Sequence, residues 1–453
     1  MQSNMRNTNE PHFIGDKGAN VVASLTTINA NKFEQLKSLP SAFVDSLTSM
    51  PQQAALSSNA IFAKFFRRKF IAMLAKLKHG RITLVDPLGT TEIGDIESDL
   101  DCTIYIADIK TYSQISLSGA NGSAQAYIDG LWSTENLSEL IRIFVRNREV
   151  LTKMESGLAR IAHFVFRYWH SRNRNTRKGS RKNIAAHYDL GNDFFRLFLD
   201  DKMMYSSALY KEGDNLRQAS ERKLQRVCDA LELCEDDHVI EIGTGWGGFA
   251  CYAASTTGCR VTTVTISKEQ FDEANRRVLY LGLENRVSVK LQDYRDIEGQ
   301  YDKVVSIEMI EAIGHQYLNT YFSKINEILS DNGKALIQAI VIDDEQYENA
   351  LKRVDYIKRY IFPGGFMPCY SVIAQFAAQN RLMLEGLHDM GLSYAQTLRD
   401  WRMRFYQRLE TVSEQGYDTS FQRMWEFYLC YCEGAFDERA TSVGQILLRK
   451  QAD

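Results

Sequence analysis

A glycine-rich turn is the part of this sequence whose residue types and spacing point most directly to ligand binding. The apolar segment His238–Ile242 is typical of a buried strand, and it runs into Gly243, Gly245, Gly247 and Gly248 before a helical pattern begins. Glycines between a strand and a helix let the backbone turn tightly and approach a ligand closely. Because dinucleotide-binding proteins use a similar turn, the glycines alone do not identify the ligand.

Residues near this turn narrow the kind of ligand. Glu241 stands two positions before Gly243, as in class I methyltransferases, and the helix does not start with the spacing of the usual dinucleotide fingerprint. The next predicted strand ends in Thr265 and Ile266, where most nucleotide sites place an acid, and Gln270 follows. These residues favour a ligand edge held by hydroxyl and amide groups over a generic NAD site.

Further strands are expected to bring more side chains to the same edge. A third strand ends at Asp293 and Tyr294, which can bracket an adenine with a carboxylate and a ring face. The segments YDKVVSIEMIEAIG and KALIQAIVID are apolar enough to be a fourth and a fifth strand of a parallel sheet. Such sheets bind ligands at the carboxyl ends of their strands, so the sequence predicts an α/β fold with a Rossmann-like sheet of the class I methyltransferase type.

A segment shortly before the glycine turn combines aromatic and polar residues in an unusual way. It reads HYDLGNDFFRLFLDDKMMYSSALY, from His187 to Tyr210. A core helix would not need His187, Asp189 and Asn192 together, and a surface helix would not need Met203 and Met204. We interpret the segment as a lid over the ligand.

The composition bounds the class of protein. The chain has 453 residues, enough for two domains, and its net charge of -3 argues against a general nucleic-acid binder. Its eight cysteines have no metal-ligand spacing, so no metal site is predicted, and without a secretory signal they are expected to be reduced thiols of a cytoplasmic protein. No apolar run reaches the roughly 18 residues that span a bilayer, so membrane contact is expected to be peripheral.

Shifts in composition divide the chain into four parts. Residues 1–60 are rich in Asn, Ser, Gln and Thr and are expected to be a flexible tail. Residues 61–158 are predicted to form a smaller α+β domain associated with lipid or membrane, 159–182 a basic linker, and 183–453 the domain with the glycine turn. The linker could be a plain tether or an electrostatic anchor for anionic lipid, at about 1 kcal/mol per basic residue near the surface.

The smaller domain offers several local predictions. IFAKFFRRKFIAMLAKLKHG has apolar residues at helical spacing beside basic ones, so it could lie among phospholipid headgroups or cover its own domain. The segments RITLVDP, LDCTIYI and SQISLSG are expected to be strands. Asn136, with Glu139 three residues later, has the spacing of a capping box and predicts the start of a helix.

Separate segments, in a fixed order, carry a resemblance to one family. They are HYDLGNDFF, MMYSSALY, EIGTGWGG, VTISKEQ, IEMIEAIGHQYLNTYF, YIKRYIFPGGFMPC and CEGAFDERATSVGQILLRK. Over about 183–450 the chain resembles the cyclopropane-fatty-acyl-phospholipid synthases and the related mycolic-acid cyclopropane synthases. GSAQAYIDGLWSTENLSELIRIFVRN extends the likeness back to about Ile61.

The resemblance implies an activity. Residues 183–453 would be a catalytic domain that moves the methyl of S-adenosylmethionine onto a cis double bond of an acyl chain in a membrane phospholipid. The π bond attacks the methyl, and the resulting carbocation loses a proton from the new methyl to a bound bicarbonate ion as a cyclopropane ring closes. The partners would be unsaturated phospholipids at the inner face of the cytoplasmic membrane. The sequence is compatible with a homodimer and does not fix the oligomeric state.

The resemblance also assigns catalytic residues. Glu311, Tyr394 and the backbone near Ile340 would hold the bicarbonate. Ser207 stands where better-known members have Cys, and Gln338 where they have His; both can still hydrogen-bond an anion. The residues expected to bind the cofactor are Tyr188, Tyr205, Ser206, Glu241, Gly243, Gly245, Thr265, Ile266, Gln270, Asp293 and Tyr294.

Three further interpretations concern the surroundings of the site. Tyr188, Tyr205 and Ser206 match the family's lid, whose aromatic faces can stabilise cationic charge and whose closure excludes water. YIKRYIFPGGFMPC is expected to line an acyl channel. Glu308 is interpreted as a carboxylate favoured by a helix N-terminus, in contrast to Glu311.

Two alternatives stay open beside ring formation. The same methyl transfer could end in a methyl-branched or methylene-bearing chain, because the position of the base decides which proton leaves. A lipid-binding protein with a degenerate cofactor site is a second alternative, and the intact Gly243, Gly245, Glu311 and Tyr394 speak against it. The sequence does not specify acyl length, double-bond position or headgroup.

Overall fold

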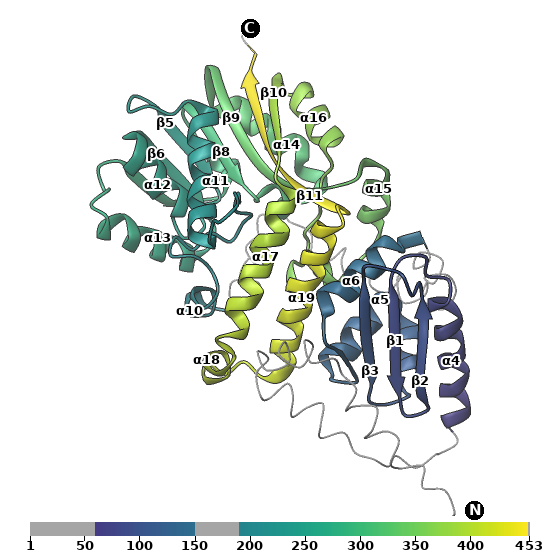
Figure 1. Cartoon of the computed structure of the whole chain (residues 1–453). Coiled ribbons are helices and arrows are strands. Elements are labelled where there is room, and N and C mark those ends of the chain that lie inside the picture. Colours follow the sequence, from purple (N-terminus) through teal and green to yellow (C-terminus); the bar gives the residue numbers. More distant parts are fainter. Residues whose placement is uncertain (1–58, 150–189, 452–453) are drawn as a thin grey trace, which may run out of the picture. The chain divides into compact units, whose positions relative to one another are not determined.

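Two sheets organise the part of the chain that the structure describes. The computed structural model describes residues 59–149 and 190–451 (Figure 1). Nearly all of the expected tail at 1–60, the basic linker at 159–182 and the lid residue Tyr188 lie outside the described residues. The domain boundaries drawn from the sequence therefore stay predictions.

The smaller sheet has four strands in the order β2-β1-β3-β4. Its strands and helices are α4 (Asn59–Leu74), β1 (Arg81–Asp86), β2 (Gly89–Gly94), β3 (Asp101–Ile106), α5 (Thr111–Ile128), β4 (Trp132–Thr134) and α6 (Leu137–Arg146). β1 is parallel to β3, whereas β2 and β4 pair antiparallel with their neighbours. Every second residue of β1 and β3 is buried, so one face of this sheet packs on the core.

The local predictions for this region have different outcomes. RITLVDP and LDCTIYI are confirmed as β1 and β3. SQISLSG, at 113–119, was expected to be a strand and is wrong, because it lies inside α5, where Tyr112 and Ile115 are buried on one helical face. The predicted helix start is confirmed: the Asn136 side chain accepts a hydrogen bond of 3.2 Å from the backbone N–H of Glu139 at the start of α6. The Glu139 carboxylate accepts from the Asn136 side-chain amide and from the backbone N–H of Asp101, so only the Asn136 half of the predicted capping box is formed.

The apolar face of α4 is buried in its own domain. Phe66, Phe70 and Leu74 belong to a core cluster with the strands of the smaller sheet. Next to these apolar residues, Arg67 Nε lies 2.5 Å from the buried Asp86 Oδ2 of β1. Of the two interpretations of this segment, packing against its own domain is therefore the one that the structure supports.

The larger sheet has seven strands in the order β10-β11-β9-β8-β5-β6-β7. They are β5 (His238–Ile242), β6 (Arg260–Thr265), β7 (Val287–Leu291), β8 (Tyr301–Ile307), β9 (Leu329–Ile342), β10 (Leu382–Asp389) and β11 (Thr441–Lys450). The first five are parallel to one another, β11 pairs antiparallel with β9, and β10 pairs antiparallel with β11. The five parallel strands are confirmed; β10 and β11 were not anticipated as strands.

Helices and short helical turns connect these strands. They are α10 (Asn192–Arg196), α11 (Leu216–Leu231), α12 (Gly248–Thr257), α13 (Lys268–Tyr280), η1 (Tyr294–Asp296), η2 (Ile310–Ala312), η3 (His315–Tyr317), α14 (Leu318–Ile328), α15 (Asp344–Lys352), η4 (Ile357–Ile361), α16 (Tyr370–Gln379), α17 (Gly391–Tyr406), α18 (Leu409–Glu414) and α19 (Thr419–Asp437). From β5 the chain adds β6 and β7 on one side of the sheet and then returns to add β8 and β9 on the other side of β5. Open parallel sheets bind ligands at such a switch point, here between β5 and β8.

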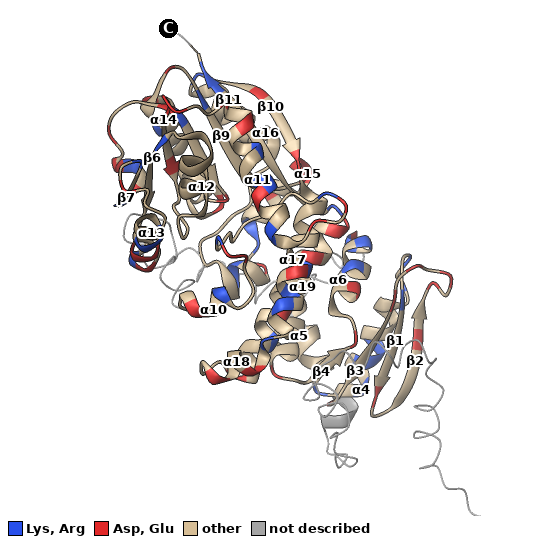
Figure 2. Ribbon diagram, turned by 60° about the vertical axis from the view of Figure 1, so that its left-hand side comes forward, with Lys and Arg blue, Asp and Glu red and all other residues tan. Residues whose placement is uncertain are grey.

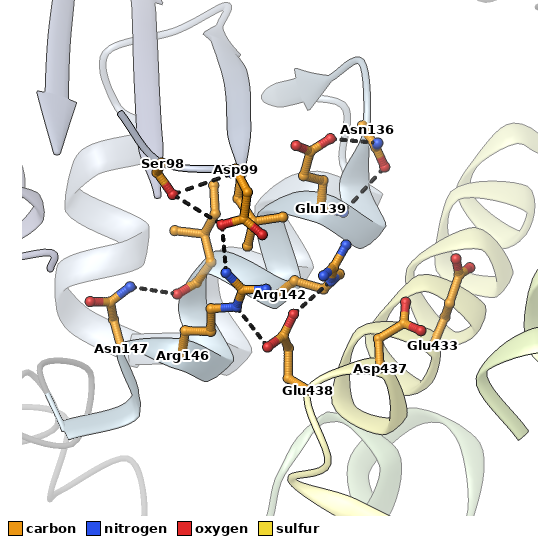
Figure 3. Close-up of polar contacts among 12 residues, drawn as sticks. Ser98, Asp99, Asn136, Glu139, Arg142, Arg146, Asn147, Glu433, Asp437 and Glu438 are labelled. Carbon is orange, nitrogen blue, oxygen red and sulfur yellow. Dashed lines mark hydrogen bonds and ion pairs between the residues drawn. The ribbon is translucent and has the colours of Figure 1, made fainter. Parts of the chain in front are cut away.

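Helix α19 joins the two sheets within one compact unit that spans 56–453. Glu438, just after α19, accepts hydrogen bonds of 2.7 Å from both Arg142 and Arg146 of α6 (Figure 3). Gly434 lets the helices approach, since a Cβ there would lie 2.8 Å from the Ile141 side chain. Figure 2 shows acidic and basic residues close together along α6, α17 and α19, where Arg399 and Glu433 form another ion pair.

Among the described residues, no helix is long and apolar enough to cross a bilayer.

Candidate active site

A cavity of about 550 Å³ opens where the parallel strands end. Its lining includes all the predicted cofactor residues that the structure describes: Tyr205, Ser206, Glu241, Gly243, Gly245, Thr265, Ile266, Gln270, Asp293 and Tyr294. Three of the predicted catalytic residues, Glu311, Ile340 and Tyr394, line it as well. The structure thus brings the two predicted groups of residues to one cavity.

The glycine turn between β5 and α12 needs its glycines for different reasons. Gly243 has a φ of 99°, and a Cβ there would lie 2.9 Å from Met309 Cγ. Gly245 has a φ of 51° and open space where a Cβ would be, on the cavity side. A side chain at Gly245 would therefore project into space that a ligand can use.

Glu241 is a buried acid at the end of β5. Its Oε2 accepts a hydrogen bond of 2.6 Å from the hydroxyl of Thr263 on the neighbouring strand. Burial raises the pKa of Glu241 to about 8, against smaller lowering effects of Thr263 and Lys223. The acid is therefore largely protonated at neutral pH in the absence of a ligand.

The next two strand ends hold their polar groups in local hydrogen bonds. The Thr265 hydroxyl donates to Gln270 Oε1 at 2.9 Å, and both side chains are buried. Both oxygens of Asp293 accept hydrogen bonds from the Arg295 guanidinium, at 2.8 and 2.6 Å, a pairing that the sequence did not suggest. The Tyr294 hydroxyl is buried without a hydrogen-bond partner among the described residues.

The lid segment packs over the cavity through aromatic contacts. The Tyr205 ring stacks on Trp401 with centroids 5.2 Å apart, and its hydroxyl lies 2.9 Å from the hydroxyl of Tyr428. Ser206 is buried, and its hydroxyl accepts a hydrogen bond of 3.0 Å from the ammonium of the fully buried Lys223. Tyr205 and Ser206 thus line the same cavity as the glycine turn.

Glu308, just after β8, is the centre of the polar network next to the cavity. Its Oε1 accepts from the backbone N–H of Ser207 and from the Gln338 side-chain amide, each at 2.8 Å. Its Oε2 accepts from the Tyr394 hydroxyl at 2.8 Å. The interpretation of Glu308 as a helix-terminal carboxylate is wrong, because three donors from three separate elements surround it.

Ser207 and Gln338 are held in place by further hydrogen bonds. The Ser207 hydroxyl donates to the Ala208 carbonyl at 2.9 Å, so the Ser207 group that donates to the Glu308 carboxylate is its backbone N–H. Gln338 Oε1 accepts from the Gln445 amide of β11 at 3.0 Å, which turns the Gln338 N–H groups toward Glu308. Both residues are fully buried.

Glu311 lies in the next turn, η2, and has a different environment. Its Oε1 accepts from the backbone N–H of Ile340 at 2.5 Å, while its buried Oε2 has no hydrogen-bond partner among the described residues. Burial, and then the charge of Glu308, raise the pKa of Glu311 to about 8. Glu311 is therefore largely neutral at pH 7.

The groups expected to hold bicarbonate are together, but they do not fit a separate ion. Tyr394, Ser207 and Gln338 are hydrogen-bonded to the Glu308 carboxylate, and Ile340 N–H is hydrogen-bonded to Glu311. A bicarbonate at that point would have to displace a carboxylate of the chain.

The remaining wall of the cavity is largely aromatic and apolar. It includes Phe362, Phe366 and Met367 of the segment expected to line an acyl channel, with Tyr428 and Phe436 of α19. The backbone N–H of Phe366 donates to the Glu311 carbonyl at 3.1 Å, which joins this segment to the polar network. The polar residues Arg148, Gln346, Asn349 and Arg353 also line the cavity.

Sequence reasoning missed two residues of this site. Lys223 lies four residues from both Ala219 and Val227, so a lone Lys in an apolar helical stripe was the available signal. Glu308 was recognised as an acid but assigned to a helix end, since nothing in the sequence links it to Gln338 or Tyr394. Such contacts depend on the order of strands in the sheet.

The sheet order, the glycine turn and the cavity at the strand ends define a class I methyltransferase that uses S-adenosylmethionine. The family model described as mycolic acid cyclopropane synthetase matches residues 175–446, and the chain belongs to this family.

Similar proteins agree with this assignment. The chain is 36% identical over 333 residues to tuberculostearic acid methyltransferase UfaA1 of Mycobacterium tuberculosis, covering 71% of this chain and 77% of that protein. It is 33% identical over 357 residues to the cyclopropane-fatty-acyl-phospholipid synthase of Escherichia coli, covering 78% of this chain and 90% of that protein. The solved structure of mycolic acid cyclopropane synthase CmaA1 with SAH and CTAB is 26% identical, with a TM-score of 0.56, and covers 60% of this chain and 98% of that one. The chain is thus an S-adenosylmethionine-dependent methyltransferase of the cyclopropane synthase family.

Proposed function

We propose that the enzyme transfers the methyl of S-adenosylmethionine to a cis double bond in an acyl chain of a membrane phospholipid, and that a cyclopropane ring is the product. The observation that carries the proposal is a single cavity in which the glycine turn, a pair of acids and an aromatic wall meet. The similarity to the Escherichia coli cyclopropane-fatty-acyl-phospholipid synthase supports the substrate class.

The residues that line the cavity suit each step of the methyl transfer. The π electrons of the alkene form the new bond to the methyl carbon, and the electrons of the broken S–C bond stay on sulfur. The carbocation left on the acyl chain would lie among aromatic faces such as Tyr205, Tyr394 and Tyr428, which attract cations. Because this wall is apolar and closed by the lid, water is kept from adding to the cation.

Four polar residues of the cavity lining support a substrate with a charged headgroup. Arg148 and Arg353 line the cavity together with Gln346 and Asn349. Guanidinium groups suit phosphate oxygens, so these residues are suited to the headgroup side of a phospholipid while the acyl chain lies along the aromatic wall.

Access to such a substrate requires contact with a membrane surface. We infer peripheral attachment at the inner face of the cytoplasmic membrane. Lys64, Arg68 and Lys69 of α4 are exposed and basic, which suits an anionic lipid surface. The apolar face of α4 is not available for insertion, so the attachment would be electrostatic.

A second product, a methyl-branched or methylene-bearing chain, is favoured by one observation. The relative with 36% identity is named a tuberculostearic acid methyltransferase and not a cyclopropane synthase. The two products share the methyl transfer and differ in how the cation is resolved.

The proposal is tested with the purified chain, S-adenosylmethionine and vesicles of an unsaturated phosphatidylglycerol. The expected result is S-adenosylhomocysteine together with an acyl chain heavier by one methylene group, whose fragmentation identifies a ring. If the fragments are those of a methyl-branched or methylene-bearing chain, that chain and not the ring is the product. Vesicles of a fully saturated phospholipid are the control, and equal turnover on them would contradict transfer to a double bond.

A further inference from the structure

We propose that the carboxylate of Glu308 is the base that accepts the proton from the transferred methyl, in the place where a bound bicarbonate was expected. This inference rests on the proposed methyl transfer to a double bond. It makes the enzyme independent of bicarbonate, because the base is part of the chain.

The first argument is the set of donors around Glu308. The Ser207 N–H, the Gln338 amide and the Tyr394 hydroxyl each lie 2.8 Å from one of its oxygens. These are groups that the family resemblance assigned to an anion, and they come from the lid, β9 and α17. A carboxylate and a bicarbonate present the same planar pair of oxygens, so one can replace the other in this set of donors.

The number of donors leaves one position open for a proton. An ionised carboxylate has about four lone-pair positions on its two oxygens. Oε1 of Glu308 accepts two hydrogen bonds, and Oε2 accepts one, from Tyr394. Glu308 lines the cavity, so Oε2 is the oxygen that can receive a proton from a ligand there.

The backbone at Glu308 is a second, independent observation. Its φ is 48°, in the left-handed region that residues other than glycine rarely adopt. The conformation is held by a hydrogen bond of 2.7 Å from the Glu308 N–H to the Gln338 carbonyl. Strain of this kind is kept where the surroundings fix a side chain for a task, and here it places the carboxylate among its three donors.

The charges around the two acids separate their roles. Burial raises the pKa of Glu308, whereas its three donors and the ammonium of Lys223 oppose the rise. Glu311 accepts from the Ile340 N–H through Oε1, while burial and then the charge of Glu308 raise the pKa of Glu311 to about 8. When two neighbouring acids compete, one ionises and the other stays protonated, and the donors assign the charge to Glu308.

The proton step balances without another reactant. A C–H bond of the new methyl breaks, its electron pair closes the ring onto the cationic carbon, and the proton goes to Oε2 of Glu308. Glu308 becomes a neutral acid and returns the proton to water after the product leaves. A methylene product, after a hydride shift along the chain, would give its proton to the same oxygen.

Two substitutions at Glu308 test the inference with the full chain. Glu308→Gln keeps the size and one acceptor but removes the base, so turnover should fall about a hundredfold or more while the affinity for S-adenosylmethionine stays within about threefold. Glu308→Gly suits the left-handed backbone and opens a space beside the same donors. Its turnover should be low and should recover, with saturation, when bicarbonate or formate is added. The matched control is Glu298→Gln, an exposed acid before the other end of β8, which should behave as the parent.

The parent enzyme should turn over equally in buffer stripped of bicarbonate and in buffer supplied with it. A parent enzyme that needs bicarbonate, or a Glu308→Gln variant with parental turnover, would overturn the inference and leave the proposed methyl transfer standing. A parent enzyme that transfers no methyl to any unsaturated phospholipid would instead refute the proposed function. Folding of each variant is checked by its thermal unfolding midpoint and its binding of S-adenosylmethionine.

Discussion

The ammonium group of Lys223 lies 3.0 Å from the hydroxyl of Ser206. Lys223 belongs to the buried face of α11, and most of the other residues on that face are apolar. Burial lowers the pKa of Lys223 to about 8, while the charges of Glu308, Asp200 and Glu241 raise it. The lysine therefore connects the lid to the acids of the cavity. A buried cation in this position favours ionised carboxylates around it.

Replacing this cation should change the pH dependence of the reaction. In Lys223→Met the long apolar side chain keeps the volume, but the ionised form of Glu308 loses an attractive charge, so the pKa of Glu308 should rise. The acid limb of the turnover profile should move to higher pH, so turnover on the acid side of the profile should fall relative to turnover at pH 8. An unchanged profile, measured under substrate saturation, would show that Lys223 only supports the lid.

Glu311 predicts how stability depends on pH. Its pKa is raised from 4.5 to about 8 in the folded chain, so folding favours its protonated form. That contribution is full below about pH 4.5 and is lost as the pH rises toward 8, by about 1.4 kcal/mol per pH unit at most. Glu311→Gln should therefore be more stable than the parent at pH 8 and close to it at pH 5, as measured by urea unfolding. Equal pH dependence of the two proteins would contradict the buried, protonated state of Glu311.

The glycine turn gives a prediction for cofactor binding. Gly245→Val places a branched side chain in the open space beside the turn, so the Kd for S-adenosylmethionine should rise at least about tenfold, or about 1.4 kcal/mol. Gly299→Val is the matched control: Gly299 also has a positive φ, of 94°, and open space, but it does not line the cavity. Similar losses of affinity in both variants, measured by calorimetry, would mean that backbone strain and not the lost space is the cause.

The basic face of α4 predicts a salt-sensitive membrane contact. Reversing the charges of Lys64, Arg68 and Lys69 to Glu should reduce cosedimentation with anionic vesicles on the order of a hundredfold at low salt, and less at high salt. Arg67 is left unchanged because it pairs with the buried Asp86. The control reverses three exposed basic residues of α13 and β7, namely Lys268, Arg276 and Lys290. If the α4 variant binds vesicles as the parent does, or if the control variant loses as much binding as the α4 variant, the membrane contact is not made by the basic face of α4.

The parts of the fold that follow local patterns could be predicted from the sequence. Strand β5 was predicted at its observed bounds, since a run of apolar residues before glycines has few alternatives. SQISLSG was misassigned because a short apolar run does not distinguish a strand from a buried helix segment. Strands β10 and β11 were missed because their pairing depends on contacts far along the chain.

The candidate site also contains residues that could be predicted from the sequence and residues that could not. The cofactor residues could be found because each follows a strand, and parallel strands end at one edge. The partners of Glu308 could not, because Ser207, Gln338 and Tyr394 lie 101, 30 and 86 residues away in the sequence. Hydrogen bonds between side chains so far apart in the sequence depend on how the helices and strands pack, and they produce no periodic pattern in the sequence.

The most direct test of methyl transfer with proton loss uses S-adenosylmethionine that carries three deuterons on its methyl, with unsaturated phospholipid vesicles and the parent enzyme. The released acyl chains are analysed by mass spectrometry. If the transferred methyl gives up one proton in the cavity, the modified chain should retain two of the three deuterons. A product that retains all three would contradict deprotonation of the new methyl, and with it the role of the acids beside the cavity.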